Sequence, residues 1–317
     1  MSTSSRFNAF CENIKLTSVQ YADAKTKYDN VCKTLHNHYY PSLEYNGSTK
    51  LLIGSYGKET AIRPPGDIDV IFKIPFETYK RFSENKTGPR GLLDEVKSVL
   101  KKTFTTTDKI KPNGIVVGVA FATFNIEVLP AFEWTVQDWN GQFQVPETSG
   151  SPLSLMGLMY PQYGLGSGLS SGYGTWKRID PRKEISELNA SNNLYDGNTK
   201  QLIKMMKMWL NNCSVDIKSV VIERIAREFM WSFAHSKSTS VYYDYMVRDF
   251  LLFLKGKRNA TIFMPGINED IQIGEDWFSK AETAYSRAVK ACEYEAQQKE
   301  FDSAYEWKKI FGDDYPY

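Results

Sequence analysis

The sequence predicts an α+β fold, in which a mixed sheet with flanking helices precedes a mostly helical lobe. Short apolar runs separated by Gly, Pro and Asp indicate strands between residues 50 and 130. Beyond Pro181, apolar residues recur at helical spacing instead. The 317 residues favour two domains. We expect them to span residues 1–160 and 161–317, and the long N-terminal helix is free to bridge both.

Two helices are predicted at the N-terminus. Apolar residues from Phe7 onward have helical spacing, and Thr17-x-x-Gln20 has the pattern of a capping box that starts a second helix. This helix should end before Pro41. Near its end, His36 and His38 have no third ligand close by, and residues two apart on a helix diverge. They are therefore interpreted as surface histidines rather than a metal pair.

The sheet lobe is predicted from the runs that follow. Residues 50–53 and 67–74 indicate strands, residues 92–100 an amphipathic helix, and residues 114–121 and 123–129 two further strands. The succession of strand, turn, strand, helix and two strands is typical of a small mixed α/β lobe.

The pattern weakens between residues 142 and 181. Residues 163–174 are rich in Gly and Ser, which favours a flexible surface connection. The alternative is a mobile loop over a site, with Tyr173 or Trp176 meeting a base. After Pro181 all remaining elements are expected to be helical, around residues 202–210, 219–233, 242–254 and 275–311.

Composition limits the classes of function. The formal net charge of +2 excludes a surface that is basic throughout, so any phosphate binding must be local. No window approaches the ~18 apolar residues of a membrane span, and the N-terminus lacks the pattern of a signal peptide. The four cysteines are scattered, as in a protein with reduced thiols. We therefore expect a cytoplasmic protein that needs no membrane.

Two aspartates at strand spacing are the strongest chemical signal. Asp67 and Asp69 should project from the same face of a strand, about 6.6 Å apart along it. Such carboxylates repel each other unless a cation lies between them, and oxygen ligands at this spacing suit Mg²⁺. Just upstream, the turn at Gly54-Ser55 offers backbone N–H groups and a hydroxyl to phosphate oxygens.

A third acid comes from the strand at residues 124–129. Glu127 shares a face with Asn125, opposite Ile126 and Val128. If this strand neighbours the one with the aspartates, three acids meet, and such a group can hold two Mg²⁺ ions about 3.5–4 Å apart for phosphoryl transfer. The alternative for Glu127 is an exposed strand residue paired with a lysine.

These residues carry a resemblance. Gly54-Ser55, Asp67-x-Asp69 and Glu127 resemble the nucleotidyltransferase core of DNA polymerase β-type enzymes. The string over residues 54–70 is more narrowly similar to the CD-NTase family, bacterial relatives of cyclic GMP–AMP synthase and oligoadenylate synthase. Further similarity lies in Trp176 with Asp180-Pro181, in Lys207-Met208-Trp209, in residues 219–223 and in residues 307–312.

The resemblance implies a two-lobed, Mg²⁺-dependent enzyme with its active site between the lobes. It would join ATP or other NTPs into cyclic di- or trinucleotides that signal in antiphage defence, with release of pyrophosphate. It implies Mg²⁺ (or Mn²⁺) on Asp67, Asp69 and Glu127, and triphosphate contacts from Gly54, Ser55, Lys207 and Ser219. A regulatory protein encoded alongside is a further expected partner.

The residues give independent support for the helical lobe. Lys200, Lys204, Lys207 and Asn211 share one helix face opposite an apolar stripe. The alternative is a solvated helix face, which is the usual meaning of such lysines.

The sequence departs from the wider superfamily in one respect. The third acid is often aspartate there and is Glu127 here, which we interpret as a variant that still ligates. No His/Cys cluster resembles the zinc-ribbon insertion of cyclic GMP–AMP synthase, so nucleic acid is not a required partner. The alternative functions are a non-cyclising nucleotidyltransferase acting on RNA or protein, a silent scaffold and a plain binding protein. For base choice, Tyr173, Trp176, Asn189 and Asn193 are candidates only.

Overall fold

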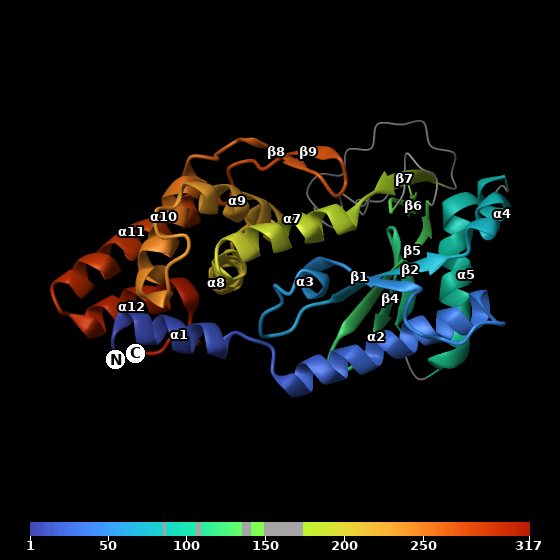
Figure 1. Cartoon of the computed structure of the whole chain (residues 1–317), viewed down its shortest axis with the longest axis horizontal. Coiled ribbons are helices and arrows are strands. Elements are labelled where there is room, and N and C mark those ends of the chain that lie inside the picture. Colours follow the sequence, from blue (N-terminus) through green and yellow to red (C-terminus); the bar gives the residue numbers. More distant parts are fainter. Residues whose placement is uncertain (85–86, 106–108, 135–140, 149–173) are drawn as a thin grey trace. The chain divides into compact units, whose positions relative to one another are not determined.

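The computed structural model describes residues 1–84, 87–105, 109–134, 141–148 and 174–317 (Figure 1). Contacts divide the chain into two compact units. The helical unit comprises Met1–Leu16, Glu59–Pro64 and Ser186–Tyr317. The sheet unit comprises Thr17–Lys58 and Pro65–Ile185. The boundary expected at residue 160 lies outside the described residues.

The sheet unit is built on a seven-stranded mixed sheet within the described residues. Its main path runs through β1 (Lys50–Leu52), β2 (Ile68–Ile74), β5 (Asn125–Glu133), β4 (Val116–Ala120) and β3 (Ile110–Asn113). The strands β6 (Phe143–Glu147) and β7 (Thr175–Ile179) extend it from β5. β2 and β5 run parallel, while the other pairs that the structure describes are antiparallel.

Helices cover this sheet. α2 (Ser18–Tyr39) and α5 (Gly88–Thr103) contact each other and the strands, and the short α3 (Gly54–Gly57) and α4 (Tyr79–Ser83) follow β1 and β2 along the chain (Figure 1). The buried stripe of α5 contains Leu92, Leu93, Val96, Val99 and Leu100, as its spacing predicts. This confirms the predicted helix and the mixed α/β character of the unit.

The two histidines of α2 differ from the prediction. His38 is exposed, but His36 is buried, with only 2% of its surface exposed. Its ring nitrogens lie 3.2 Å from Thr49 Oγ1 and 3.0 Å from the carbonyl oxygen of Leu43. The surface interpretation is therefore wrong for His36, because the loop after α2 folds back and satisfies both nitrogens.

The helical unit gathers both chain ends (Figure 1). Its helices are α1 (Thr3–Asn13), α8 (Asn198–Asn212), α9 (Ser219–Ser232), α10 (Tyr243–Lys255), α11 (Phe278–Ala296) and α12 (Glu300–Phe311). The helix α7 (Pro181–Leu194) begins in the sheet unit and ends in this one. The core is aromatic: the Phe7 ring lies 5.1 Å from that of Trp307, and Phe10 lies 4.5 Å from Phe311.

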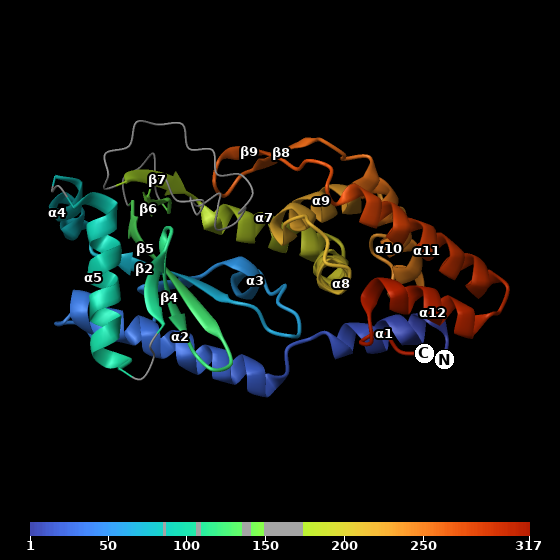
Figure 2. The ribbon, with the colours of Figure 1, turned by 180° about the vertical axis from the view of Figure 1, so that it is seen from behind.

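Two predictions for this unit are corrected. Residues 275–311 form two helices, α11 and α12, rather than one long helix. A hairpin of β8 (Thr261–Met264) and β9 (Glu269–Gln272) also interrupts the helical pattern, with β8 in contact with α9 (Figure 2). Among the described residues, no helix is both long enough and apolar enough to cross a bilayer.

Candidate active site

The pairing of β2 with β5 places two of the predicted acids side by side. In the parallel register, Asp69 lies opposite Glu127, and Ile68 lies opposite Ile126. Ile68, Val70, Ile126 and Val128 are fully buried, so the carboxylates occupy the other face. The two strands are thus neighbours, which is the condition under which Glu127 was expected to join the aspartates.

Asp67 completes the acid group from just before β2. It is exposed, and Asn125 donates a hydrogen bond from its side-chain amide to Asp67 Oδ1 at 2.9 Å. Asn125, which was predicted only to share a strand face with Glu127, thus contacts the carboxylate of Asp67.

The carboxylates interact electrostatically. Burial raises the pKa of Glu127 to about 7, and the negative charges of Asp69 and Asp67 act in the same direction. Two or more carboxylates that share a site disfavour joint ionisation. A cation bound among them would remove this repulsion, which is the behaviour expected of a metal-binding group.

The donor set fits a hard cation by its chemistry. All three side chains present carboxylate oxygens, the ligands that Mg²⁺ prefers. Within the described ranges, however, no three His, Cys, Asp or Glu side chains are gathered closely enough to hold an ion as they stand. Side-chain rotation would have to bring the carboxylates to a shared ion.

Gly54 begins α3 in direct proximity to Asp69. Its φ is +57°, and a Cβ at this position would lie 1.9 Å from Asp69 Oδ2. The backbone also joins the two elements, since Ile53 donates its N–H to the carbonyl oxygen of Asp69 at 3.0 Å. Glycine is therefore required here both by conformation and by space. The half-buried Ser55 follows it in the chain.

The other two predicted nucleotide contacts belong to the helical unit. Lys207 on α8 is 7% exposed, and its ammonium lies 2.7 Å from Glu223 Oε1 and 2.7 Å from Thr60 Oγ1. Ser219 is the exposed first residue of α9. Their participation in one site with the carboxylates stays a prediction.

The remaining lysines of the stripe on α8 are not a solvated face. Lys200 is 9% exposed and pairs with Glu59 at 2.8 Å. Lys204 is half-buried, and burial, with the charges of Lys15 and Lys200 in support, lowers its pKa. The solvated alternative is therefore wrong for Lys200 and Lys207.

Sequence reasoning missed the partners of these lysines. Glu59 and Thr60 were noted only within the similar string at residues 54–70, and Glu223 only as part of the similar segment at residues 219–223. The signal that was present is charge: two buried lysines on one helix each need an acid nearby.

The four candidates for base recognition lie in different parts of the chain. Trp176 packs in the sheet unit, with its ring 5.3 Å from Tyr79 and 5.6 Å from Phe132. Asn189 and Asn193 lie on α7. Tyr173 and the Gly/Ser-rich stretch, with its two interpretations, lie outside the described residues apart from Gly174.

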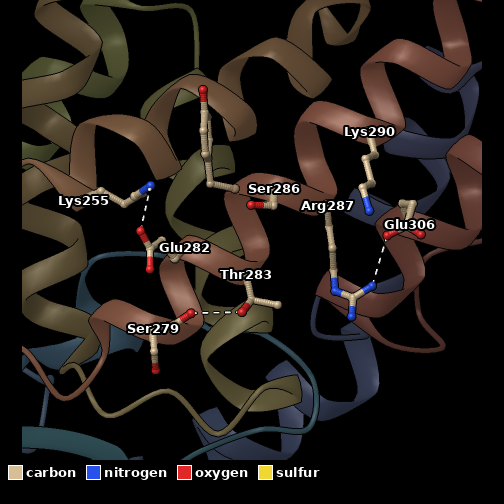
Figure 3. Close-up of a pocket in the computed structure, with 9 residues that line it drawn as sticks. Lys255, Ser279, Glu282, Thr283, Ser286, Arg287, Lys290 and Glu306 are labelled. Carbon is tan, nitrogen blue, oxygen red and sulfur yellow. Dashed lines mark hydrogen bonds and ion pairs between the residues drawn. The ribbon is translucent and has the colours of Figure 1, made fainter.

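The helical unit also has a polar hollow of about 610 Å³ (Figure 3). Its lining comes from α10, α11 and α12, and Figure 3 shows Lys255 turned toward Glu282 and Arg287 toward Glu306. The paired atoms are 3.5 Å and 3.0 Å apart. None of the predicted site residues lines it.

Comparisons with known proteins agree with this geometry. Residues 1–151 match the family model of Second Messenger Oligonucleotide or Dinucleotide Synthetase (SMODS) domains. A probable cyclic nucleotide synthase of Bacillus cereus (strain VD146) is 25% identical over 340 residues, which cover 98% of this chain and 97% of that protein.

Solved structures share the fold. CdnC of E. coli MS115-1 in its complex with HORMA-deltaN has a TM-score of 0.68 at 16% identity, over 99% of this chain and 98% of CdnC. CdnC with ATP gives 0.66 at 17% identity, over 99% of both chains. The cyclic AMP-GMP synthase DncV of Vibrio cholerae gives 0.67 at 11% identity, over 96% of this chain and 94% of DncV. The chain is thus similar in fold to the solved CD-NTases, and its residues 1–151 match the SMODS family model.

Proposed function

We propose that this protein is a nucleotidyltransferase that makes cyclic oligonucleotide second messengers from ATP and other NTPs and releases pyrophosphate. The observation that carries the proposal is the pairing of Asp69 with Glu127 on parallel strands, directly beside the turn at Gly54-Ser55. The Bacillus cereus relative, similar over nearly its whole length, is named as a probable cyclic nucleotide synthase.

The proposed metal is Mg²⁺, with Mn²⁺ as a substitute, held by Asp67, Asp69 and Glu127. When bound, such ions lower the pKa of an attacking hydroxyl and stabilise the charge on a leaving pyrophosphate. The oxygen-only donor set and the mutual repulsion of these carboxylates support this proposal.

The chain's own residues would act on the nucleotides as follows. Gly54 N–H and the Ser55 hydroxyl bind phosphate oxygens of the donor, with Lys207 and Ser219 as the contacts from the helical unit. The acceptor 2′- or 3′-hydroxyl forms a bond to the α-phosphorus, and the bond to the β-phosphate oxygen breaks. Glu127 receives the hydroxyl proton and returns it to solvent. A second attack of the same kind closes the ring.

The biological setting is part of the same proposal. We propose that the protein works in the cytoplasm in antiphage signalling of the CBASS type. The complex of CdnC with HORMA-deltaN supports a regulatory protein as a partner, and the structure of CdnC with ATP supports an NTP substrate.

The direct test combines two substitutions. The double variant Asp67→Asn, Asp69→Asn should lose all product while its circular dichroism spectrum stays that of the wild type. Asp94→Asn, an exposed aspartate on α5, is the matched control and should keep full activity. Cyclic product formed at the wild-type rate by the double variant would refute the assignment.

Product analysis separates cyclisation from the alternative. Mixed NTPs are incubated with the protein, treated with phosphatase and analysed by mass spectrometry. A cyclic product has no terminal phosphate and survives, whereas a linear product or a modified RNA or protein identifies a non-cyclising enzyme.

A further inference from the structure

A buried polar trio joins three segments of the helical unit. Lys207 of α8, Glu223 of α9 and Thr60 are 7%, 6% and 0% exposed. The Lys207 ammonium lies 2.7 Å from Glu223 Oε1, 2.7 Å from Thr60 Oγ1 and 3.3 Å from the carbonyl oxygen of Thr60. The Thr60 hydroxyl in turn donates to Glu223 Oε1 at 3.1 Å.

The three side chains of the trio are all linked to one another by polar contacts. An ammonium group has three N–H donors, and here three acceptors surround it. The Thr60 hydroxyl accepts from Lys207 and donates to Glu223, so it links the two charged groups. Removal of one member leaves a buried charge or donor without its partner, which is costly in a protein interior.

Thr60 lies in the segment that leads to Asp67 and Asp69, called here the acid pair. Residues Glu59–Pro64, called here the acid-pair loop, connect α3 to β2 and belong by their contacts to the helical unit. The residues on either side of the loop, including Gly54 and Asp67, belong to the sheet unit. The loop is therefore a short covalent bridge from one unit into the metal-site motif of the other.

The loop is held at both ends as well as at Thr60. At its start, Glu59 pairs with Lys200 at 2.8 Å. At its end, Arg63 donates its backbone N–H to the carbonyl oxygen of Ile14 at 2.9 Å, and its guanidinium donates to the carbonyl oxygens of Glu12 and Asn13. The Glu59 pair is exposed on its acid side, whereas the trio at Thr60 is fully buried. The trio is thus the main attachment of the loop.

We infer that Lys207, Glu223 and Thr60 form an anchor that fixes the acid-pair loop and so acts as a set of positioning residues for Asp67 and Asp69. The inference rests on the proposed function in so far as it concerns catalysis. A loop held at Thr60 leaves six residues of chain between the anchor and Asp67, and this short tether restricts where the carboxylate can lie.

The anchor also constrains how Lys207 can serve a nucleotide. Because its three donors are already engaged, Lys207 can contact a triphosphate oxygen only by giving up one of these bonds. The bond to the Thr60 carbonyl is the longest and would be exchanged first.

The test uses substitutions that change hydrogen bonds and preserve shape. Thr60→Val removes the hydroxyl at nearly constant volume, and Thr60→Ser keeps it. Glu223→Gln removes the charge and provides a second variant. Glu187→Gln is the matched control, since Glu187 pairs with Arg227 at 2.8 Å in the same unit and belongs neither to the loop nor to the trio.

The first measurement needs neither nucleotide nor activity. Hydrogen exchange of the peptide that contains Arg63 reports the bond from its amide to Ile14. We expect exchange about tenfold faster in Thr60→Val and Glu223→Gln, the effect of one lost buried hydrogen bond. Thr60→Ser and Glu187→Gln should match the wild type. Equal exchange in all variants would overturn the anchor.

The second measurement separates positioning from a purely structural role. Pyrophosphate release should show kcat about tenfold lower in Thr60→Val, KM for ATP within about twofold, and recovery in Thr60→Ser. Unchanged kcat together with faster exchange would overturn the positioning role and leave only an anchor. If the wild type itself releases no pyrophosphate, the proposed function fails, while the exchange measurement still decides on the anchor.

Discussion

Gly54 and Asp69 lie so close that the backbone of the first leaves no room for a side chain beside the carboxylate of the second. A Cβ on Gly54 would lie 1.9 Å from Asp69 Oδ2, and the φ of Gly54 is +57°. The turn at Gly54 and the strand β2 therefore approach each other as closely as a glycine allows, which makes this contact a sensitive test of the site.

Gly54→Ala should damage both stability and activity. The left-handed backbone costs an alanine about 1 kcal/mol or more, and the new methyl group must displace Asp69. We expect a lower melting temperature and at least about tenfold slower pyrophosphate release, because a displaced Asp69 would hold the proposed metal less well.

Gly47→Ala separates the two effects. Gly47 has φ +81°, but a Cβ there would meet only the flexible end of Lys50, at 3.6 Å. This control should lose similar stability and keep its activity. Equal activity in both variants would show that the contact between Gly54 and Asp69 has no part in catalysis.

Metal removal and Glu127 form a second test. EDTA should abolish pyrophosphate release, and added Mg²⁺ or Mn²⁺ should restore it. Glu127→Gln should lower kcat by about 10²–10⁴, the range for loss of a positioned acid or base. Glu44→Gln, an exposed glutamate of the same unit, should have no effect. A Glu127→Gln variant as active as the control would assign catalysis to other residues.

Asp244 predicts a pH dependence of stability in the helical unit. Burial raises its pKa from 3.8 to about 6, although the backbone N–H groups of Tyr245 and Asp244 act in the opposite direction. The folded state thus binds this proton more tightly than the unfolded state. The contribution of Asp244 to the free energy of unfolding therefore falls as pH rises from about 4 to 6, by at most roughly 3 kcal/mol.

Asp244→Asn should remove this loss. The variant should be more stable than the wild type above pH 6, and the difference should shrink toward pH 4, as measured by urea unfolding across pH. Asp249→Asn on the same helix, whose side chain pairs with Arg248 at the surface, is the control. A stability gain independent of pH would exclude the titration of Asp244 as its cause.

The capping box of α2 gives a prediction for the sheet unit. Thr17 Oγ1 accepts from the Gln20 N–H at 3.1 Å, and the Gln20 side chain accepts from the Thr17 N–H at 3.0 Å. Thr17→Ala should cost about 1 kcal/mol in chemical denaturation. Thr26→Ala, the same change at an exposed position within α2, should stay within ±0.5 kcal/mol. Equal losses in the two variants would argue against the cap.

The strands of the sheet unit were largely predictable from the sequence, because polar and apolar residues alternate within short stretches. The alternation in residues 67–74 and 124–129 placed Asp69 and Glu127 on the polar faces of two strands. The register shows that these strands are neighbours. The capping box at Thr17 was equally legible, because both of its partners lie within four residues.

The break between α11 and α12 could not be predicted, because the residue that makes it is unusual. Lys299 donates to the Tyr294 carbonyl at 2.8 Å and Gln298 to that of Glu295 at 2.9 Å, the two bonds of a Schellman motif. Its left-handed position, usually glycine, is Gln298 with φ +60°. Because residues 294–300 contain neither Gly nor Pro, nothing in the sequence marks the end of α11.

The remaining features could not be predicted, because they depend on contacts between residues far apart in the sequence or on very short strands. The burial of His36 depends on Thr49 and Leu43, and that of Lys207 on Glu223 and Thr60. The hairpin strands β8 and β9 have only four residues each, too few for a periodic signal. Such partners are set by tertiary folding rather than by spacing.

The aromatic core that joins α1 to α12 has a consequence for the order of folding during synthesis. Phe10 packs on Phe311, and Phe7 packs on Trp307, so these two side chains of α1 meet their partners on α12 only after about 300 further residues have been made. At 5–20 residues per second, this interval is roughly 15–60 s. During it, the faces of Phe7 and Phe10 that pack on α12 have no native cover, while the strands of the sheet unit can already pair. Nascent chains stalled after residue 260 should therefore protect the sheet unit, but not α1, from proteolysis.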